Sequence, residues 1–289
     1  MYIDTHCHLT FPEFHPDRPM VIGNAKKAGV KKFIVPGVDP LSSRQSVELA
    51  KKHPGVTFAS VGFHPYEAQR SQGIGVLESL LRQWNNKTMK QSLIVAIGEC
   101  GLDYHQYKGE KAAGKKSAQK SLFEEHLRLA LRFGLPVIVH CRDGTSYDPA
   151  AFDGGGTSYD PAAFDGGAFG DLFSVLDGLP DMPRGVLHCF SGGLQELRMA
   201  RERNLFIGID GNVTYAKQLE AIVPHIPLES LLLETDSPYL TPIPHRGQRN
   251  EPKYLPLVAK KIAELMGKTV KDIEEKTTGN AKSLFQLSS

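Results

Sequence analysis

The stretch IDTHCHL, at residues 3–9, holds two histidines, His6 and His8, that are separated by a single residue. Side chains two positions apart diverge on a helix but point the same way on a strand, because strand side chains alternate. The apolar run at residues 1–3 therefore predicts a first strand with both imidazoles near its carboxyl end. Two imidazoles directed at one point form half of a metal site. Such a pair also occurs by chance on surfaces, so the prediction depends on further ligands at the ends of other strands.

The composition is that of an ordinary globular protein. Hydrophobic residues make up 40% of the 289 positions, charged residues make up 23%, and the net charge is only +2. This balance does not indicate a nucleic-acid binder by itself, so any such partner must be argued from local patches. No run approaches the ~18 apolar residues of a membrane span. No charged segment followed by an apolar one precedes the first expected strand, which predicts a cytoplasmic protein.

Short apolar runs alternate with amphipathic stretches along the whole chain. The expected strands are Tyr2–His6, Lys32–Gly37, Thr57–Phe63, Leu93–Glu99, Pro136–Cys141, Gly185–Phe190, Leu205–Asp210 and Ser230–Asp236. The expected helices are Leu41–Lys52, Gly75–Asn85, Ser117–Arg132, Leu194–Arg203, Ala216–Val223, Tyr254–Met266 and Val270–Phe285. This alternation predicts an α/β protein with one domain, a (β/α)8 TIM-type barrel over residues 1–289. A dinucleotide-binding fold is disfavoured, because no Gly-x-Gly-x-x-Gly follows the first strand.

A tandem repeat interrupts this pattern after the fifth expected strand. Residues 144–155 read GTSYDPAAFDGG, and residues 156–167 repeat them letter for letter. Two short units do not make a solenoid. The glycine, proline, aspartate and serine content predicts a loop, and we interpret 144–167 as a duplicated and tolerated surface insertion. The alternative is an insertion that shapes the substrate cleft.

Residues that bind metals gather where these strands are expected to end. They are His6, His8, His64, Glu99, His140, His188 and Asp236. The carboxyl ends of all eight strands of a barrel converge on one mouth, where barrel enzymes keep their active sites. A lone histidine is more often a hydrogen-bonded polar residue than a ligand. Buried together, however, these groups would be costly without a cation, so the set predicts a metal centre.

The four cysteines, Cys7, Cys100, Cys141 and Cys189, each adjoin one of these expected ligands. If the ligands point into the barrel, strand alternation turns the cysteines outward, towards the helical layer. We therefore expect small buried hydrophobic side chains with reduced thiols, rather than ligands or disulfide partners.

The motifs that contain these residues carry a family resemblance. The order IDTHCHL, GFHP, IGECGLD, VIVHCRD, VLHCFSG, GIDGNVTY, LLLETDSPYL and RNEP resembles the TatD family of metal-dependent deoxyribonucleases. That family belongs to the wider amidohydrolase-like barrel group. The resemblance runs from residue 2 to about residue 286. The departure is 144–167, where relatives pass more directly from the fifth strand into a helix.

The resemblance implies a ligand set and a role for each member. His6, His8 and Asp236 would hold one divalent ion, His140 and His188 a second, and Glu99 would bridge the two. Asp236 would also guide the proton of the nucleophile. His64 would contact the scissile phosphate or an additional metal, although a structural histidine is an open alternative. Imidazoles and carboxylates accept Zn²⁺, Mn²⁺ or Mg²⁺, and the sequence does not choose among them.

Basic residues near the expected mouth are candidates for binding phosphates. The lysines that follow the fourth strand are Lys108, Lys111, Lys115, Lys116 and Lys120. Arg246 and Arg249 follow the eighth strand, a customary place for phosphate groups in barrels. Arg142 lies two residues after His140 and should point inward with it. The alternative for the lysines is a solvated face.

We therefore expect a metal-dependent hydrolase that cleaves phosphodiesters in DNA, as an exonuclease or a repair-type nuclease on single strands or strand ends. The rival enzyme class hydrolyses a small ester, lactone or amide. Within the barrel group, the resemblance associates that class with a bridging carboxylated lysine, whereas the fourth strand here carries Glu99. A third reading is a nucleic-acid-binding scaffold without chemistry, which the intact ligand set disfavours. Neither a membrane nor an obligate protein partner is indicated by the sequence.

Overall fold

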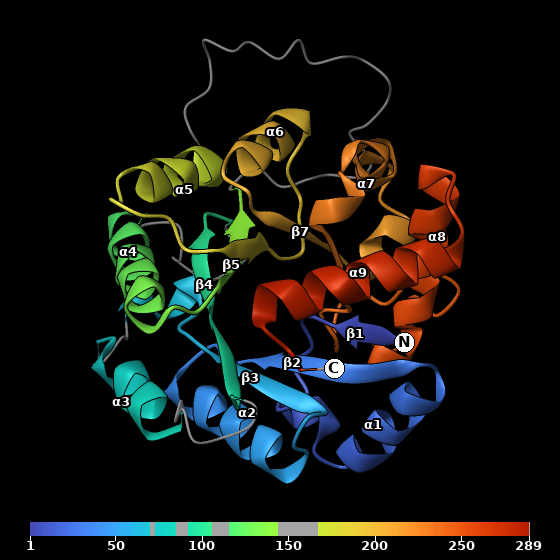
Figure 1. Ribbon diagram of the computed structural model, residues 1–289, viewed down its shortest axis with the longest axis horizontal. Helices are drawn as coiled ribbons and strands as arrows, with labels where there is room; N and C mark the ends of the chain where they lie inside the picture. Colours follow the sequence, from blue (N-terminus) through green and yellow to red (C-terminus); the bar gives the residue numbers. More distant parts are fainter. Residues whose placement is uncertain (70–72, 85–91, 106–115, 144–166, 289) are drawn as a thin grey trace.

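The structure is a computed structural model that describes residues 1–69, 73–84, 92–105, 116–143 and 167–288 (Figure 1). The described residues form one eight-stranded parallel sheet in the order β1 to β8. Its strands are β1 Tyr2–Asp4, β2 Val30–Pro36, β3 Thr57–Val61, β4 Ile94–Asp103, β5 Val137–Arg142, β6 Gly185–Leu187, β7 Phe206–Ile209 and β8 Leu231–Leu233. Helices lie between successive strands, and the sheet curls into a nearly closed barrel. The predicted (β/α)8 architecture is confirmed.

The barrel closes through backbone hydrogen bonds just beyond the ends of β1 and β8. The amide of Thr5 donates to the carbonyl of Leu233 at 3.1 Å, and that of Asp236 donates to His6 at 2.9 Å. The amide of His8 donates to the carbonyl of Ser237 at 2.8 Å, next to a parallel bridge at Cys7. The seam of the barrel is therefore the backbone that carries three of the predicted ligands.

The helices form a layer around the sheet (Figure 1). They are α1 Arg18–Lys27, α2 Pro40–Lys52, α3 Gly75–Trp84, α4 Lys116–Phe133, α5 Gly167–Asp177, α6 Leu194–Glu202, α7 Lys217–Ile222, α8 Leu255–Met266 and α9 Val270–Phe285. The sequence prediction missed α1 and α5. Helix α1 contains Gly23 and buries only Val21, Ile22 and Ala25, so its apolar stripe is weak. Helix α5 begins at the last residue of the repeat, where the glycine-rich composition predicted a loop.

Apolar side chains fill the amino-terminal half of the barrel. The interior residues come from seven strands and are Ile3, Ile34, Phe58, Val95, Ile138, Val186 and Leu232. Leu284 and Phe285, at the carboxyl end of α9, pack against this group, and α9 crosses this end of the barrel (Figure 1). Because this end is apolar and covered, polar side chains are left to the carboxyl ends of the strands.

A second, larger cluster lies between the strands and the helices. Cys7, Cys100 and Cys141 belong to it, so these three thiols face the helical layer, as the alternation of strand side chains predicted. Cys189 is only partly buried. None of the helices in the described ranges combines the length and the apolar character that a membrane span requires.

The two ends of the repeat segment meet at the start of α5. A carboxylate oxygen of Asp143 accepts a hydrogen bond from the backbone amide of Ala168, in the first turn of that helix. Residues 144–166 lie outside the described residues, so the prediction of a tolerated loop stays a prediction. The side chain of Asp143, before residues 144–166, thus caps the first turn of α5, which follows them.

We expect that deletion of residues 156–167 leaves the fold and the cap intact. The two copies are identical, so Gly155 would take the place of Gly167 directly before Ala168. Halving a loop changes its closure free energy by only about 0.6 kcal/mol. The melting temperature should therefore rise by no more than about 2 °C, and the rate of hydrolysis of a minimal phosphodiester should stay close to that of the parent.

The matched control is Asp143→Ala, which removes the cap but keeps the loop. It should cost about 1 kcal/mol of stability. If the shortened protein folds but loses its hydrolytic activity, the insertion shapes the cleft and the interpretation as a tolerated loop is wrong.

Candidate metal centre

Glu99 lies at the centre of the carboxyl-terminal mouth of the barrel. It is in β4, and only 3% of its surface is exposed. Its Oε2 atom is 3.3 Å from Nε2 of His6 and 3.7 Å from Nε2 of His8. Its Oε1 atom is 2.9 Å from Nε2 of His188 and 3.1 Å from Nδ1 of His140. Each oxygen of one carboxylate thus faces a different pair of imidazole nitrogens.

The first pair is completed by a second carboxylate. Nε2 of His6 and Nε2 of His8 are 3.2 Å apart. Oδ1 of Asp236 is 3.3 Å from the His8 nitrogen and 3.7 Å from the His6 nitrogen. His6 and His8 follow β1 and Asp236 follows β8, so the backbone bonds of the seam hold these three side chains in register.

The second pair comes from β5 and from the residue after β6. Nδ1 of His140 and Nε2 of His188 are also 3.2 Å apart. Two neighbouring nitrogens that bind one ion at ~2.0–2.1 Å stand about 2.8–3.4 Å apart, from octahedral to tetrahedral geometry. Both pairs have this spacing, so the residues fit a divalent ion beside each oxygen of Glu99.

Three of the ligands, Glu99, Asp236 and His6, have pKa values shifted toward their deprotonated forms. Burial would raise the pKa of Glu99, but the charge of His188 and hydrogen bonds from neighbouring imidazoles hold it well below its usual range. The pKa of Asp236 is likewise lowered: burial opposes the shift, and His8 and His6 drive it. Burial, together with the charge of His188, lowers the pKa of His6 to about 4. Anionic carboxylates and a neutral imidazole are the forms that bind metal ions.

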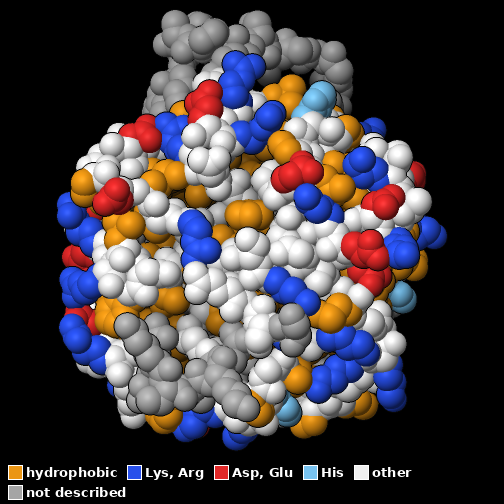
Figure 2. All heavy atoms as spheres, viewed as in Figure 1, with side chains coloured by type: hydrophobic (Ala, Val, Ile, Leu, Met, Phe, Trp, Pro, Cys, Tyr) orange, Lys and Arg blue, Asp and Glu red, His pale blue; other side chains and the backbone are white. Residues whose placement is uncertain are grey.

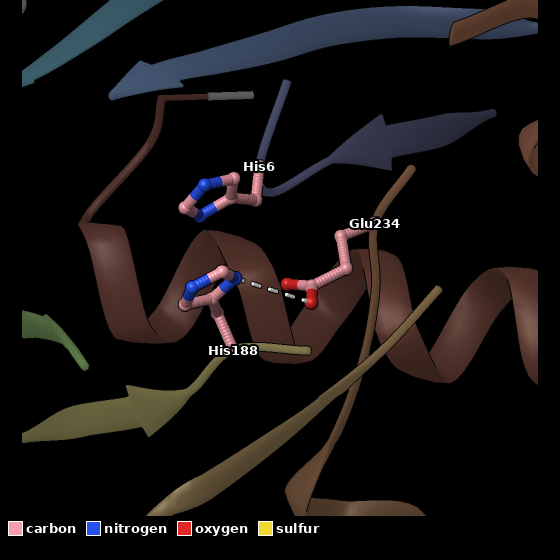
Figure 3. A group of neighbouring side chains, drawn as sticks. All are labelled: His6, His188 and Glu234. Atoms are coloured by element: carbon pink, nitrogen blue, oxygen red, sulfur yellow. Dashed lines mark ion pairs between the residues drawn. The ribbon is translucent and has the colours of Figure 1, made fainter. Parts of the chain in front are cut away.

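Two further carboxylates lie near the second imidazole pair, each beside the ring nitrogen that faces away from Glu99. Asp103 lies 3.0 Å from Nε2 of His140, which leaves Nδ1 free to face the centre. Burial would lower the pKa of His140, but its hydrogen bonds to Asp103 and Glu99 raise it to about 10. Glu234 lies 3.8 Å from Nδ1 of His188 (Figure 3) and also accepts a hydrogen bond from the amide of Cys189. A carboxylate in the position of Asp103 orients a metal-binding imidazole, whereas Glu234 lies beyond hydrogen-bonding distance of His188.

Asp103 and Glu234 lie inside the quoted motifs but were not among the predicted ligands. The available signal was a second carboxylate near the end of the same strand, in IGECGLD and LLLETD. The rings of His6 and His188 also lie one above the other (Figure 3). Their centroids are 3.9 Å apart and their planes are at 7°. That contact joins the two halves of the centre, and no sequence pattern predicts it.

His64 borders the centre on the side of β3. Its Nε2 atom is 3.6 Å from Oε1 of Glu99. The backbone amide of Tyr66 donates to its Nδ1 atom at 3.3 Å, so a neutral ring carries its proton on Nε2. Burial, with the charge of His140 next, lowers the pKa of His64 to about 3. With Asp103 and His140, His64 also forms a third group that could hold an ion, so both predicted roles remain predictions.

The predicted phosphate-binding residues occupy different settings. Arg246 is exposed, and its guanidinium lies over the ring of Tyr215 at 3.8 Å. Arg249 is 29% exposed and pairs with Asp17 at 2.7 Å and with Glu251 at 3.1 Å. These carboxylates neutralise the charge of Arg249. The sequence does not reveal these pairs, because Asp17 is far from Arg249 in the chain and the two-residue spacing to Glu251 predicts no contact.

The other basic candidates also differ in whether an acidic partner neutralises them. Arg142 is exposed at the last position of β5. Lys120 pairs with Asp171 at 3.1 Å, and Lys116 lies over the ring of Tyr104 at 4.5 Å. Lys108, Lys111 and Lys115 lie outside the described residues. On the face that α9 crosses, basic and acidic side chains are interspersed (Figure 2), as expected from the small net charge.

The fold and the site define a (β/α)8 barrel with a candidate two-ion centre at the carboxyl ends of its strands. The sequence profile of the family described as TatD related DNase matches residues 3–286. The chain therefore belongs to the TatD family of metal-dependent hydrolases.

Individual relatives agree with this assignment over the full length of the chain. An uncharacterized metal-dependent hydrolase of Bacillus subtilis, YabD, is 34% identical, with 99% of this chain and 100% of that protein covered. The 3'-5' ssDNA/RNA exonuclease TatD of Edwardsiella piscicida is 33% identical, with 99% of both chains covered. The crystal structure of the TatD homologue YjjV from Escherichia coli superposes with a TM-score of 0.79 at 30% identity, covering 99% of this chain and 98% of that one.

We expect Glu99→Ala to lose both ions while the barrel stays folded, because each half of the centre shares this carboxylate. His6→Ala should weaken mainly one ion and His140→Ala mainly the other, since their nitrogens face different oxygens of Glu99. Metal analysis of the purified variants measures this directly. A Glu99 variant that keeps the metal content of the parent would contradict the assignment.

Metal removal should also change stability in the parent but not in the Glu99 variant. An ion present at about a hundredfold excess over its Kd stabilises a folded protein by about 2.7 kcal/mol. Chelation should therefore lower the melting temperature of the parent by several degrees and leave that of Glu99→Ala unchanged. Asp171→Asn is the matched control: its carboxylate pairs with Lys120 outside the centre, so its response to chelation should equal that of the parent.

Proposed function

We propose that this protein hydrolyses phosphodiester bonds in DNA, with two divalent ions held at the mouth of the barrel. His6, His8 and Asp236 would hold one ion, His140 and His188 the other, with Glu99 between them. The observation that carries the proposal is the division of the two Glu99 oxygens between two pairs of imidazole nitrogens, each pair 3.2 Å apart.

The names of relatives support the substrate class. The relatives from Edwardsiella piscicida and Erwinia tasmaniensis are both called 3'-5' ssDNA/RNA exonucleases, and each is 33% identical to this chain. We therefore place single-stranded nucleic acid, cleaved from its 3' end, first among the candidate substrates. The cytoplasmic location stays a prediction.

The residues divide the chemical work among themselves. When bound, a pair of divalent ions supplies a Lewis acid for the phosphate oxygens and lowers the pKa of water towards neutrality. Asp236 reaches the first imidazole pair with an ionised carboxylate, so it can orient the attacking water and accept its proton. Neutral His64 presents an Nε2 proton beside Glu99 and can donate it as a hydrogen bond to a phosphate oxygen.

Binding of a polymer requires cations beyond the centre. Arg246 is exposed on the segment after β8, and the face of Tyr215 holds its planar guanidinium. A guanidinium fixed in this way suits a phosphate group. Arg249 is held by Asp17 and Glu251, so we assign the larger share of phosphate binding on this side to Arg246.

We expect kcat/KM for a single-stranded oligonucleotide to fall steeply as salt rises, because bound phosphates release counterions. Each neutralised phosphate contributes about −0.7 to the logarithmic slope on single strands. Hydrolysis of a minimal phosphodiester such as bis(p-nitrophenyl) phosphate should hardly respond. Arg246→Gln should flatten the oligonucleotide slope by about this increment and leave the minimal substrate unaffected.

Arg249→Gln serves as the matched control, since it removes an equal charge from the same segment. Its main effect should be a lower melting temperature, because Asp17 and Glu251 lose their shared cation. Equal salt responses of the two substrates, or no cleavage of oligonucleotides with Mg²⁺, Mn²⁺ or Zn²⁺, would favour hydrolysis of a small ester, lactone or amide instead.

A further inference from the structure

Two aromatic side chains border the first imidazole pair of the centre. The ring of Phe11 stacks on His8, with centroids 4.3 Å apart and planes at 20°. The ring of Tyr239 stands edge-on to both, 6.4 Å from His8 and 6.3 Å from Phe11. Phe11 follows β1 and Tyr239 follows β8, so the barrel seam holds this aromatic pair, Phe11 and Tyr239, beside the ligands.

Tyr239 is exposed, yet its backbone is firmly held. Half of its surface, 50%, is open to solvent. The fully buried side chain of Asn250 donates to the carbonyl of Tyr239 at 2.6 Å and to that of Thr235 at 2.8 Å. The amide of Tyr239 donates to the carbonyl of Asp236 at 3.0 Å. A large ring on a backbone that is held before binding loses less entropy when a partner covers it than a ring on a mobile loop.

The location of the pair indicates which partner that is. Phe11 packs on His8, and Tyr239 is three residues from Asp236, so both adjoin the half of the centre where Asp236 is proposed to guide the attacking water. A phosphate bound at the centre would bring its neighbouring nucleotides to this rim. A nucleobase is the planar part of such a nucleotide, and aromatic side chains stack on bases of any sequence.

We propose that Tyr239, backed by Phe11, forms the stacking platform for the base of one of the two nucleotides that flank the scissile phosphate. This inference rests on the proposed function and adds a specificity-determining residue to it. In a duplex the same base is paired and stacked on its neighbours, so the platform can receive it only from a single strand or a frayed end. The platform therefore predicts that this protein prefers single strands and needs no contacts that distinguish one base from another.

The test combines protein variants with modified substrates. Tyr239→Ala should lower kcat/KM on a single-stranded oligonucleotide by about tenfold, within the range that alanine substitution gives for base–aromatic stacking. Two further oligonucleotides carry an abasic site on one side or the other of the scissile phosphate. The parent should lose a similar factor on one of them, and Tyr239→Ala should lose nothing more there. Tyr239→Phe, which keeps the ring, should behave as the parent.

Two controls separate stacking from damage to the centre. Tyr239→Ala should retain the metal content of the parent. Ile243→Ala changes a residue of the same segment that is also 50% exposed, and this variant should discriminate against the abasic oligonucleotide as strongly as the parent does. If Tyr239→Ala loses the same factor on intact and abasic oligonucleotides, or loses metal, the stacking role is overturned while the proposed function stands. If the parent cleaves no oligonucleotide at all, both proposals fall.

Discussion

The structure depends on how one buried carboxylate is accommodated. Glu99 has almost no contact with solvent, and burying its charge would be costly without a cation or hydrogen-bond donors beside it. Five imidazole nitrogens, those of His64 and of the two ligand pairs, surround its two oxygens at 2.9–3.7 Å. The nitrogens come from segments far apart in the chain, and the barrel, whose strands all end at one mouth, brings them together.

The backbone bonds that close the barrel also position the site. The backbone bonds that join the segments after β1 and β8 position His6, His8 and Asp236, and they also set Tyr239 beside His8. At the other end of the barrel, apolar side chains and the end of α9 supply the packing. One end of the barrel interior is therefore filled with apolar side chains, while the other end can concentrate polar groups.

Much of this could be predicted from the sequence, for an identifiable reason. Ligands placed at the ends of alternating apolar runs, such as His140 and His188, must converge if the runs form a barrel, so their assembly follows from topology. Features that depend on tertiary partners could not be predicted. The ion pair of Arg249 with Asp17, the contact of Asp103 with His140 and the stacking of His6 on His188 join residues whose spacing in sequence carries no signal. Strand ends were also misjudged: β1, β6 and β8 stop before the ligands, and the residues beyond them pair through separate backbone hydrogen bonds, such as that from Asp236 to His6.

The measurement that tests this account most directly is a crystal structure of the protein with Mn²⁺, with the ions located by their anomalous scattering. The account requires two peaks, one within bonding distance of Nε2 of His6 and His8 and the other of Nδ1 of His140 and Nε2 of His188, with Glu99 reaching both. A single peak that does not touch Glu99, or two ions that are both bound elsewhere, would contradict it.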